Sequence, residues 1–180
     1  MTQYIVITAI GSDRPGLVDE ISSFLAARKI NIEDSRMAVL GGEFAVILLA
    51  AGAPGFTEKL GSELPQLEKK TGLSIQVKQT VAPSERKIKP SIPHRLVATS
   101  MDHPGIVQEI TRILHNRAIN IESLETRVIN APLSGAPIFK MKCIINIPAE
   151  LKLATVRREL EKLGDRMDID IEIEATDTFQ

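Results

Sequence analysis

The sequence predicts an α+β protein made of two consecutive units, each with the element order βαββαβ. SDRPGLV at 12–18 recurs as MDHPGIV at 101–107, and INIE at 30–33 recurs at 119–122. Both repeats are displaced by the same 89 positions (12 to 101 and 30 to 119). A register that stays constant over a strand, a turn and a helix is typical of a duplicated structural unit.

Composition limits the classes of protein to consider. The chain has 180 residues, a net charge of −1 and 43% hydrophobic residues, which suits two small globular domains. The near-neutral charge and the 3% aromatic content argue against direct nucleic-acid binding. The single Cys143 excludes an internal disulfide framework. No apolar run is as long as a membrane span and no signal peptide is evident, so we expect a cytoplasmic protein without membrane contact.

The first unit opens with a strand, a turn and a helix. Tyr4–Ile10 is apolar and rich in β-branched residues, which predicts a buried central strand. Residues 13–16 (DRPG) then turn the chain into a helix, where proline in the first turn needs no N–H partner. Apolar residues follow at helical spacing: Leu17, Val18, Ile21, Phe24 and Leu25. The second copy repeats this stripe as Ile106, Val107, Ile110, Ile113 and Leu114.

Three further strands complete the sheet of the first unit. Ile30–Leu40 and Phe44–Ala50 lie on either side of Gly41-Gly42, which is a hairpin signal. Leu73–Val81 alternates strictly between apolar and polar residues, which predicts a strand with one solvated face.

A second helix is expected in each unit. In the first, Thr57 can cap a helix whose apolar stripe is Leu60, Leu64 and Leu67. Pro65 is expected to break that helix into two short pieces, because it lacks an N–H and clashes with the preceding turn. In the second unit, Leu153, Val156, Leu160 and Leu163 predict a helix that ends at Gly164.

The segment between the copies reads as a linker. Residues 82–93 (APSERKIKPSIP) carry three prolines and no periodicity, so we expect domains at 1–81 and 94–180. The strands expected in the second unit are Arg95–Met101, Ile119–Ile129, Ile138–Ile147 and Ile169–Glu174. Each unit is therefore expected to be a ferredoxin-like antiparallel sheet with two helices on one face.

No catalytic or metal-binding motif is evident. The sequence lacks a P-loop, a nucleophile elbow, a zincin motif and a Gly-rich dinucleotide turn. His94, His103 and His115 do not have the spacing of metal ligands, and His115 is expected at the surface. Cys143 falls on the apolar side of its strand and is expected to be a buried packing thiol. We therefore expect neither an enzyme nor a bound cofactor.

The Asp-x-Pro-Gly turns are the best candidates for a ligand site. A helix N-terminus offers free N–H groups and a partial positive charge for a carboxylate, and a glycine without Cβ lets a small ligand approach the backbone. An Asp or Asn oxygen can hold an ammonium group, so the expected ligand is a small amino acid. The candidate residues are Asp13, Gly16, Leu17 and Asn31 in the first unit, and Asp102, Gly105, Ile106 and Asn120 in the second.

Simpler interpretations compete with this site. Each Asp can instead bond the first-turn amides of its own helix while Pro-Gly merely makes the turn, and this interpretation is favoured on spacing alone. Asn31 and Asn120 are expected near the same end of the sheet as the turns, but they can equally serve local turn bonding. The basic residues Arg86, Lys87 and Lys89 are best explained as a solvated linker.

These residues together resemble the ACT domain, a regulatory module that commonly binds amino acids between paired copies. The segments YIVITAIGSDRPGLV at 4–18 and NIEDSRMAVLGGEFAVILL at 31–49 are similar to double-ACT transcriptional repressors linked to glycine cleavage. The second half resembles ACT domains more generally, and it carries a longer loop at 130–137. The resemblance implies a glycine-responsive repressor that acts through a separate LysR-type DNA-binding activator, without touching DNA itself.

Other functions remain open on the sequence. The chain could be an ACT regulatory subunit of an amino-acid or folate enzyme, since DRPGLV also resembles the start of formyltetrahydrofolate deformylases. It could also be a purely structural oligomerisation module. In each case a homo-oligomer is expected, with glycine as the first effector to test.

Overall fold

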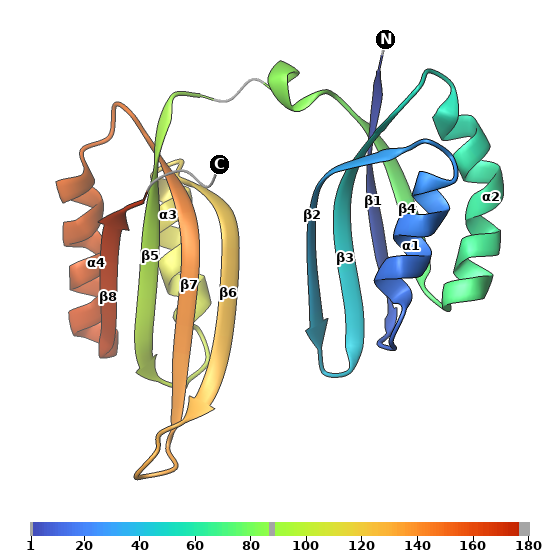
Figure 1. Ribbon diagram of the computed structural model, residues 1–180. Coiled ribbons are helices and arrows are strands. Elements are labelled where there is room, and N and C mark those ends of the chain that lie inside the picture. The colour runs from blue at the N-terminus through green and yellow to red at the C-terminus, as the bar shows by residue number, and fades with distance from the viewer. Residues whose placement is uncertain (1, 87–88, 177–180) are drawn as a thin grey trace. The chain divides into compact units, whose positions relative to one another are not determined.

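The computed structural model describes residues 2–86 and 89–176 (Figure 1). Its contacts divide the chain into two compact units, Met1–Lys87 and Ile88–Gln180. Within the segment expected to be a linker, Pro83–Glu85 forms one 3₁₀ turn, η1. The first strand of the second unit already begins at Ser91, earlier than the prolines of this segment suggested.

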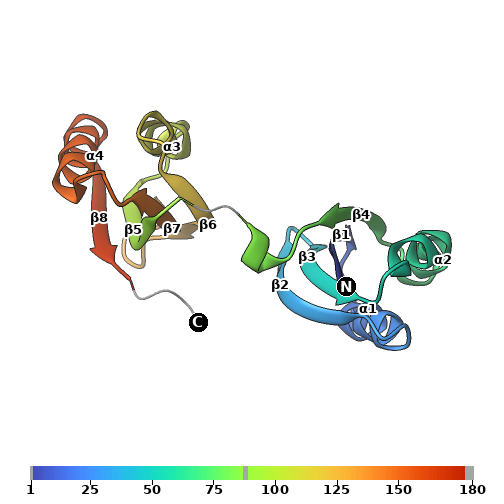
Figure 2. The ribbon, with the colours of Figure 1, turned by 90° about the horizontal axis from the view of Figure 1, so that it is seen from above.

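Unit 1 has the predicted order of elements. Its strands form one antiparallel sheet in the order β2-β3-β1-β4. Both helices lie on one face of that sheet, as the view from above shows (Figure 2). The elements are β1 (Gln3–Ser12), α1 (Leu17–Ala26), β2 (Asn31–Leu40), β3 (Glu43–Gly52), α2 (Phe56–Thr71) and β4 (Ser74–Thr80).

Strand alternation explains why the helices cover only one face. Ile5, Ile7 and Ala9 of β1 are buried, and they pack with the apolar stripe of α1 that includes Leu17 and Leu25. The residues between them along β1 point to the other face, because side chains alternate along a strand. We call the face without helices the open face of the unit.

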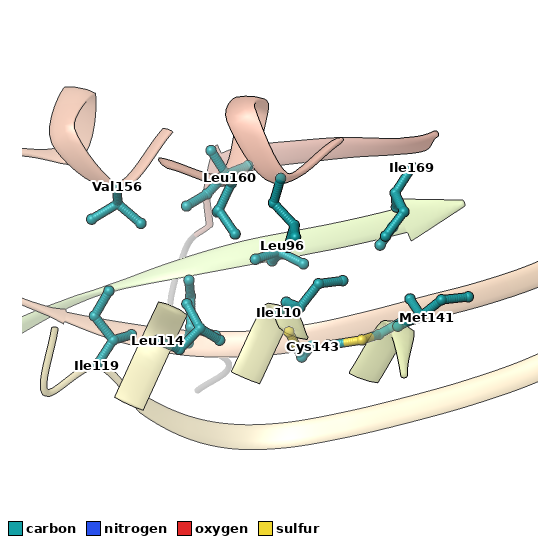
Figure 3. Close-up of a cluster of buried hydrophobic side chains, with 14 of the residues drawn as sticks. Leu96, Ile110, Leu114, Ile119, Met141, Cys143, Val156, Leu160 and Ile169 are labelled. Carbon is teal, nitrogen blue, oxygen red and sulfur yellow. The ribbon is translucent and has the colours of Figure 1, made fainter. Parts of the chain in front are cut away.

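Unit 2 repeats this arrangement with sheet order β6-β7-β5-β8. Its core includes Leu96, Ile110, Met141 and Leu160 and lies between the sheet and both helices (Figure 3). The elements are β5 (Ser91–Met101), α3 (Ile106–Asn116), β6 (Asn120–Asn130), β7 (Pro137–Pro148), α4 (Leu153–Met167) and β8 (Ile169–Ala175). The predicted α+β class with two ferredoxin-like βαββαβ units is confirmed.

The prediction that Pro65 breaks the second helix is wrong. α2 runs without interruption from Phe56 to Thr71, with Pro65 inside it and exposed. An internal proline costs about 3 kcal/mol in a helix. Leu60 and Leu67 are buried on either side of it, so packing against the sheet holds both halves in line. Thr57 does not cap this helix either; the N-cap is Gly55, with a left-handed backbone.

The predicted end of the last helix at Gly164 is also wrong. α4 continues to Met167, and Asp168 takes the left-handed C-cap position at φ 55°. Gly164 is buried, and a Cβ atom on it would lie 2.5 Å from the carbonyl oxygen of Ile169. This glycine therefore allows α4 and the start of β8 to approach closely.

Substituting this glycine tests the close approach. We expect Gly164→Ala to lower the free energy of unfolding by about 1–3 kcal/mol, because the backbone of Ile169 must move. Gly61→Ala is the matched control, since Gly61 is also helical and has nothing within 4 Å of an added Cβ. It should raise stability by up to about 1 kcal/mol. Urea denaturation followed by circular dichroism measures both, and equal effects would contradict the explanation.

Candidate functional site

The first Asp-x-Pro-Gly turn is tied to the hairpin between β2 and β3. The amide of Asp13 donates a hydrogen bond to the carbonyl oxygen of Gly42 at 2.9 Å. Gly16 is exposed and adopts a left-handed backbone at φ 94°, which glycine accepts without the steric cost of a Cβ. It is the N-cap of α1, and its carbonyl accepts the first helical bond from Glu20 at 2.9 Å. The amides before Glu20 therefore face the turn as free helix N-terminal donors.

The second turn has the same geometry. Asp102 donates its amide hydrogen to the carbonyl of Pro137 at 3.0 Å, at the matching hairpin of unit 2. Gly105 has φ 102° and caps α3, and Glu109 donates to its carbonyl at 3.0 Å. Ile106 is buried, as Leu17 is in the first turn, so both side chains anchor their helices rather than line the surface.

The carboxylates of both aspartates are unengaged. Asp13 and Asp102 are exposed, and within the described residues neither side chain has a hydrogen bond or an ion pair. No side-chain cap is present at the start of α1 or α3. The competing interpretation, in which each Asp bonds the first amides of its own helix, is therefore not what this structure shows.

An ion pair that was not predicted from the sequence crosses the first turn. Arg14 donates two hydrogen bonds to Glu20, at 3.0 and 2.8 Å, and a third to the carbonyl of Lys70 at 3.1 Å. The bond from Arg14 lowers the pKa of Glu20, and the same bond raises the pKa of Arg14. Arg14 thereby links the turn to the last turn of α2. The spacing of Arg14 and Glu20 was visible in the sequence, but the contact with Lys70 required the fold.

The second turn lacks this pair. His103 stands where Arg14 stands in the first copy, and its Nδ1 lies 3.1 Å from the carbonyl of Pro104. Glu109, the counterpart of Glu20, is held by Arg112 at 2.5 Å and by Arg166 at 3.1 Å instead. The two turns thus share a backbone geometry but differ in the cation beside it.

The expected place of Asn31 and Asn120 is wrong within each unit. Asn31 begins β2 opposite Ala51, which in turn lies opposite Tyr4 near the start of β1. The turn at Asp13 follows the other end of β1, about 30 Å away at the rise of a strand. α1 runs back along the sheet before β2 begins, so Asn31 lies at the end of the sheet where β1 starts.

Asn120 repeats this placement, and its surroundings differ from those of the turn. It begins β6 opposite Asn146, at the end of the sheet away from Asp102. There it borders a surface hollow of about 510 Å³ beside α3, which does not include Asp102 or Gly105. Asn31 donates a hydrogen bond to Glu33 at 2.8 Å. One unit therefore brings together the Asp, the Gly and the first helical residue, and leaves the Asn apart.

Comparison with known proteins places these two units in a family. A profile of the ACT domain matches residues 3–78. The glycine cleavage system transcriptional repressor of Escherichia coli K12 is 30% identical over 162 residues, which cover 89% of this chain and 83% of that protein. The chain belongs to the family of glycine cleavage system transcriptional repressors.

Solved structures share its fold over the full length. A protein of unknown function from Galdieria sulphuraria superimposes with a TM-score of 0.82 at 29% identity, over 98% of this chain and 100% of that one. A crystal structure provisionally named as a glycine cleavage system transcriptional repressor gives a TM-score of 0.71 at 25% identity, over 99% of each chain. A UPF0237 protein of Methanopyrus kandleri is 40% identical over 74 residues, which are 82% of its length but 40% of this chain. Both units of this repressor-family chain are ACT-type domains.

Other chemistry in the two ACT units is sparse. In the described ranges 2–86 and 89–176, no group of three His, Cys, Asp or Glu side chains could hold a metal ion. His115 is exposed, as expected. No helix in this part of the chain is long and apolar enough to cross a membrane.

The thiol of Cys143 is a packing group, as the sequence predicted. It is 2% exposed within the core of the second ACT unit, beside Ile110 and Met141 (Figure 3). Burial raises its pKa from 9.0 to about 11, so it carries no nucleophilic thiolate at neutral pH.

This pKa makes a testable prediction. At pH 8, a thiol reagent should label Cys143 only as fast as the unit opens, and denaturant should make labelling immediate. Because the pKa of Cys143 is raised in the folded protein, the unfolded chain loses this proton first as the pH rises above 9. The free energy of unfolding is therefore unaffected by this thiol below pH 9 and falls as the pH rises towards about 11. Cys143→Ala should therefore lose less stability than the wild-type protein over that pH range. Rapid labelling of the folded protein would contradict this assignment.

Proposed function

We propose that this chain is an amino-acid-responsive regulator, a glycine-linked transcriptional repressor that acts through a separate LysR-type DNA-binding protein. Its family membership supports the regulatory role. The two exposed Asp-x-Pro-Gly turns are the proposed sites at which it senses an amino acid. The net charge of −1 favours action by protein contact over action by direct DNA binding. In this proposal the protein works in the cytoplasm and has no catalytic activity of its own.

The chemistry of the first turn suits a small zwitterion. The ligand carboxylate would accept hydrogen bonds from the free amides after Gly16, where the partial positive charge of α1 also attracts it. The unengaged carboxylate of Asp13 would hold the ammonium group. The exposed Gly16 has no Cβ, so the ligand can reach the backbone. Asp102, Gly105 and the amide of Ile106 offer the same groups in unit 2.

The two turns differ in the side chain beside them. Arg14 lies beside the first turn, where the second has His103. Because Arg14 is paired with Glu20, it adds no net charge beside the turn. The first turn lies in the half of the chain that the ACT profile matches, and on that ground we propose it as the principal site. Within a single unit, Asn31 and Asn120 lie too far from the turns to touch the same small ligand.

Regulation requires the ligand to distinguish two states. Glycine can change repression only if it binds the repressor alone and the repressor–activator complex with different affinity. Because glycine has few atoms, at about −1.5 kcal/mol per heavy atom its Kd is micromolar or weaker. Such an affinity suits a metabolite that is present at high concentration.

Calorimetric titration with glycine tests the site. Gly16→Ala should weaken glycine binding at least about tenfold, because a Cβ enters the approach to the amides and strains a turn at φ 94°. Gly55→Ala is the matched control: Gly55 is also a left-handed helix N-cap, at φ 80°, but it precedes α2 at the other end of the sheet. It should carry a similar cost in stability and leave binding unchanged.

Three results would contradict the proposal. The first is a wild-type protein that binds no amino acid at millimolar concentration. The second is a folded Gly16→Ala variant that binds glycine as tightly as wild type. The third is equal loss of binding in both variants, which would mean that stability and not the turn controls affinity. Melting curves of both variants provide the folding control.

A further inference from the structure

The open faces of the two units differ, although their folds match. In unit 1, the open-face residues of the two central strands are mostly apolar, and Ile10 and Ile47 are 57% and 49% exposed. None of these residues belongs to the apolar cluster between the sheet and the helices, although Ala51 is buried. They are Tyr4, Val6, Thr8 and Ile10 of β1, and Ala45, Ile47, Leu49 and Ala51 of β3.

The same positions in unit 2 carry charge. Val6 of β1 corresponds to Arg95 of β5, because the repeat displaces the chain by 89 positions. The residues paired with equivalent positions of β1 and β5 are equivalent too, so Ala45 of β3 corresponds to Lys140 of β7, and Ile47 to Lys142. All three cations are exposed. Unit 2 thus shows that the fold itself does not need an apolar open face, and the apolar face of unit 1 requires another reason.

The strand register arranges the open face of unit 1 in rows that run across all four strands. The row through Val6 joins Asp34 of β2, Leu49 of β3, Val6 of β1 and Lys78 of β4. Its two middle residues are apolar, and its two ends carry opposite charges. Asp34 at one end also pairs with Arg36 on the same strand. The next row is Arg36, Ile47, Thr8 and Gln76, and the one after it is Ala38, Ala45, Ile10 and Ser74.

We propose that the open face of unit 1 is the surface on which a second copy of this chain docks, sheet against sheet, about a twofold axis parallel to the strands. Such an axis places each row on the same row of the partner in reverse order. Asp34 then faces Lys78 of the other copy, and Leu49 faces Val6. The row is therefore complementary to itself in charge and in hydrophobicity, which is what a symmetric dimer requires.

The size of the face suits a dimer. Four strands spaced by about 4.8 Å and rising about 3.3 Å per residue give a face of roughly 19 by 28 Å, before the relief of the side chains is counted. This area is of the same order as the about 800 Å² that each partner contributes to a specific interface. The open face of unit 2 is a poor alternative occupant, because docking it there would bury charged groups, among them Lys140, Lys142 and the Glu125 opposite Lys142, against apolar side chains.

Sedimentation of the full chain at about 1–200 µM tests the proposal. We expect a dimer in this range. Ile47→Lys should weaken self-association at least about tenfold, because it buries an unpaired lysine at the centre of the interface. This variant should still fold, since Lys142 occupies the equivalent place in unit 2.

The matched control lies on the opposite face of the same sheet. Met37 of β2 is 54% exposed and pairs with Val46, which packs against the core. Met37→Lys should leave the dimer unchanged. A wild-type chain that is monomeric throughout the range would overturn the proposal. So would a dimer that survives Ile47→Lys, or one that Met37→Lys disrupts equally, because either would place the contact elsewhere.

Zero-length cross-linking tests the orientation. A carbodiimide should join the carboxylate of Asp34 to the amine of Lys78 across the dimer, and mixing isotope-labelled with unlabelled chains shows that the link is intermolecular. Within one chain the two residues are three strand spacings apart, about 14 Å, which is beyond their combined reach. A dimer in which this link never forms would exclude the strand-parallel axis and overturn the proposed packing.

Discussion

Two helices can cover only one face of a four-stranded sheet, and each unit is shaped by this constraint. It requires β1 and β5 to alternate between residues that pack under the helices and residues that do not. The β1–α1 and β5–α3 turns lie at one end of each sheet, where α1 and α3 start from left-handed glycines. The core and the open face are two consequences of the same layered arrangement.

Duplication has kept the backbone and changed what lies on it. Gly16 and Gly105 have nearly the same φ, and both aspartate amides bond a carbonyl at the neighbouring hairpin. The side chains around them have diverged, with Arg14 bound to Glu20 in one unit and Glu109 bound to two other arginines in the other. The open faces have diverged further. A second copy of a stable fold is free to change its surface, because the buried stripes alone maintain the domain.

Features that depend on local sequence could be predicted, and those that depend on chain direction or long-range packing could not. The repeat displacement and the apolar periodicities were enough to predict the order of the strands and α-helices in both units, but not the extent of α2 and α4. Asn31 lies at the starting end of the sheet because α1 runs back along it before β2 begins. The periodicity of apolar residues predicts a helix but not the direction in which it runs. Local propensity alone does not predict how Pro65 and Gly164 are accommodated, because that depends on the sheet that packs against their helices. The contact of Arg14 with Lys70 joins residues far apart in sequence, so only the fold brings it out.

The hydrogen bond from Asp13 to Gly42 makes the turn before α1 and the tip of the β2–β3 hairpin one mechanical piece. This hairpin joins β2, an edge strand, to β3 in the interior of the sheet. Any displacement of this turn would act directly on the hairpin through that bond. In this small domain, a single backbone hydrogen bond separates the candidate ligand site from the edge of the sheet.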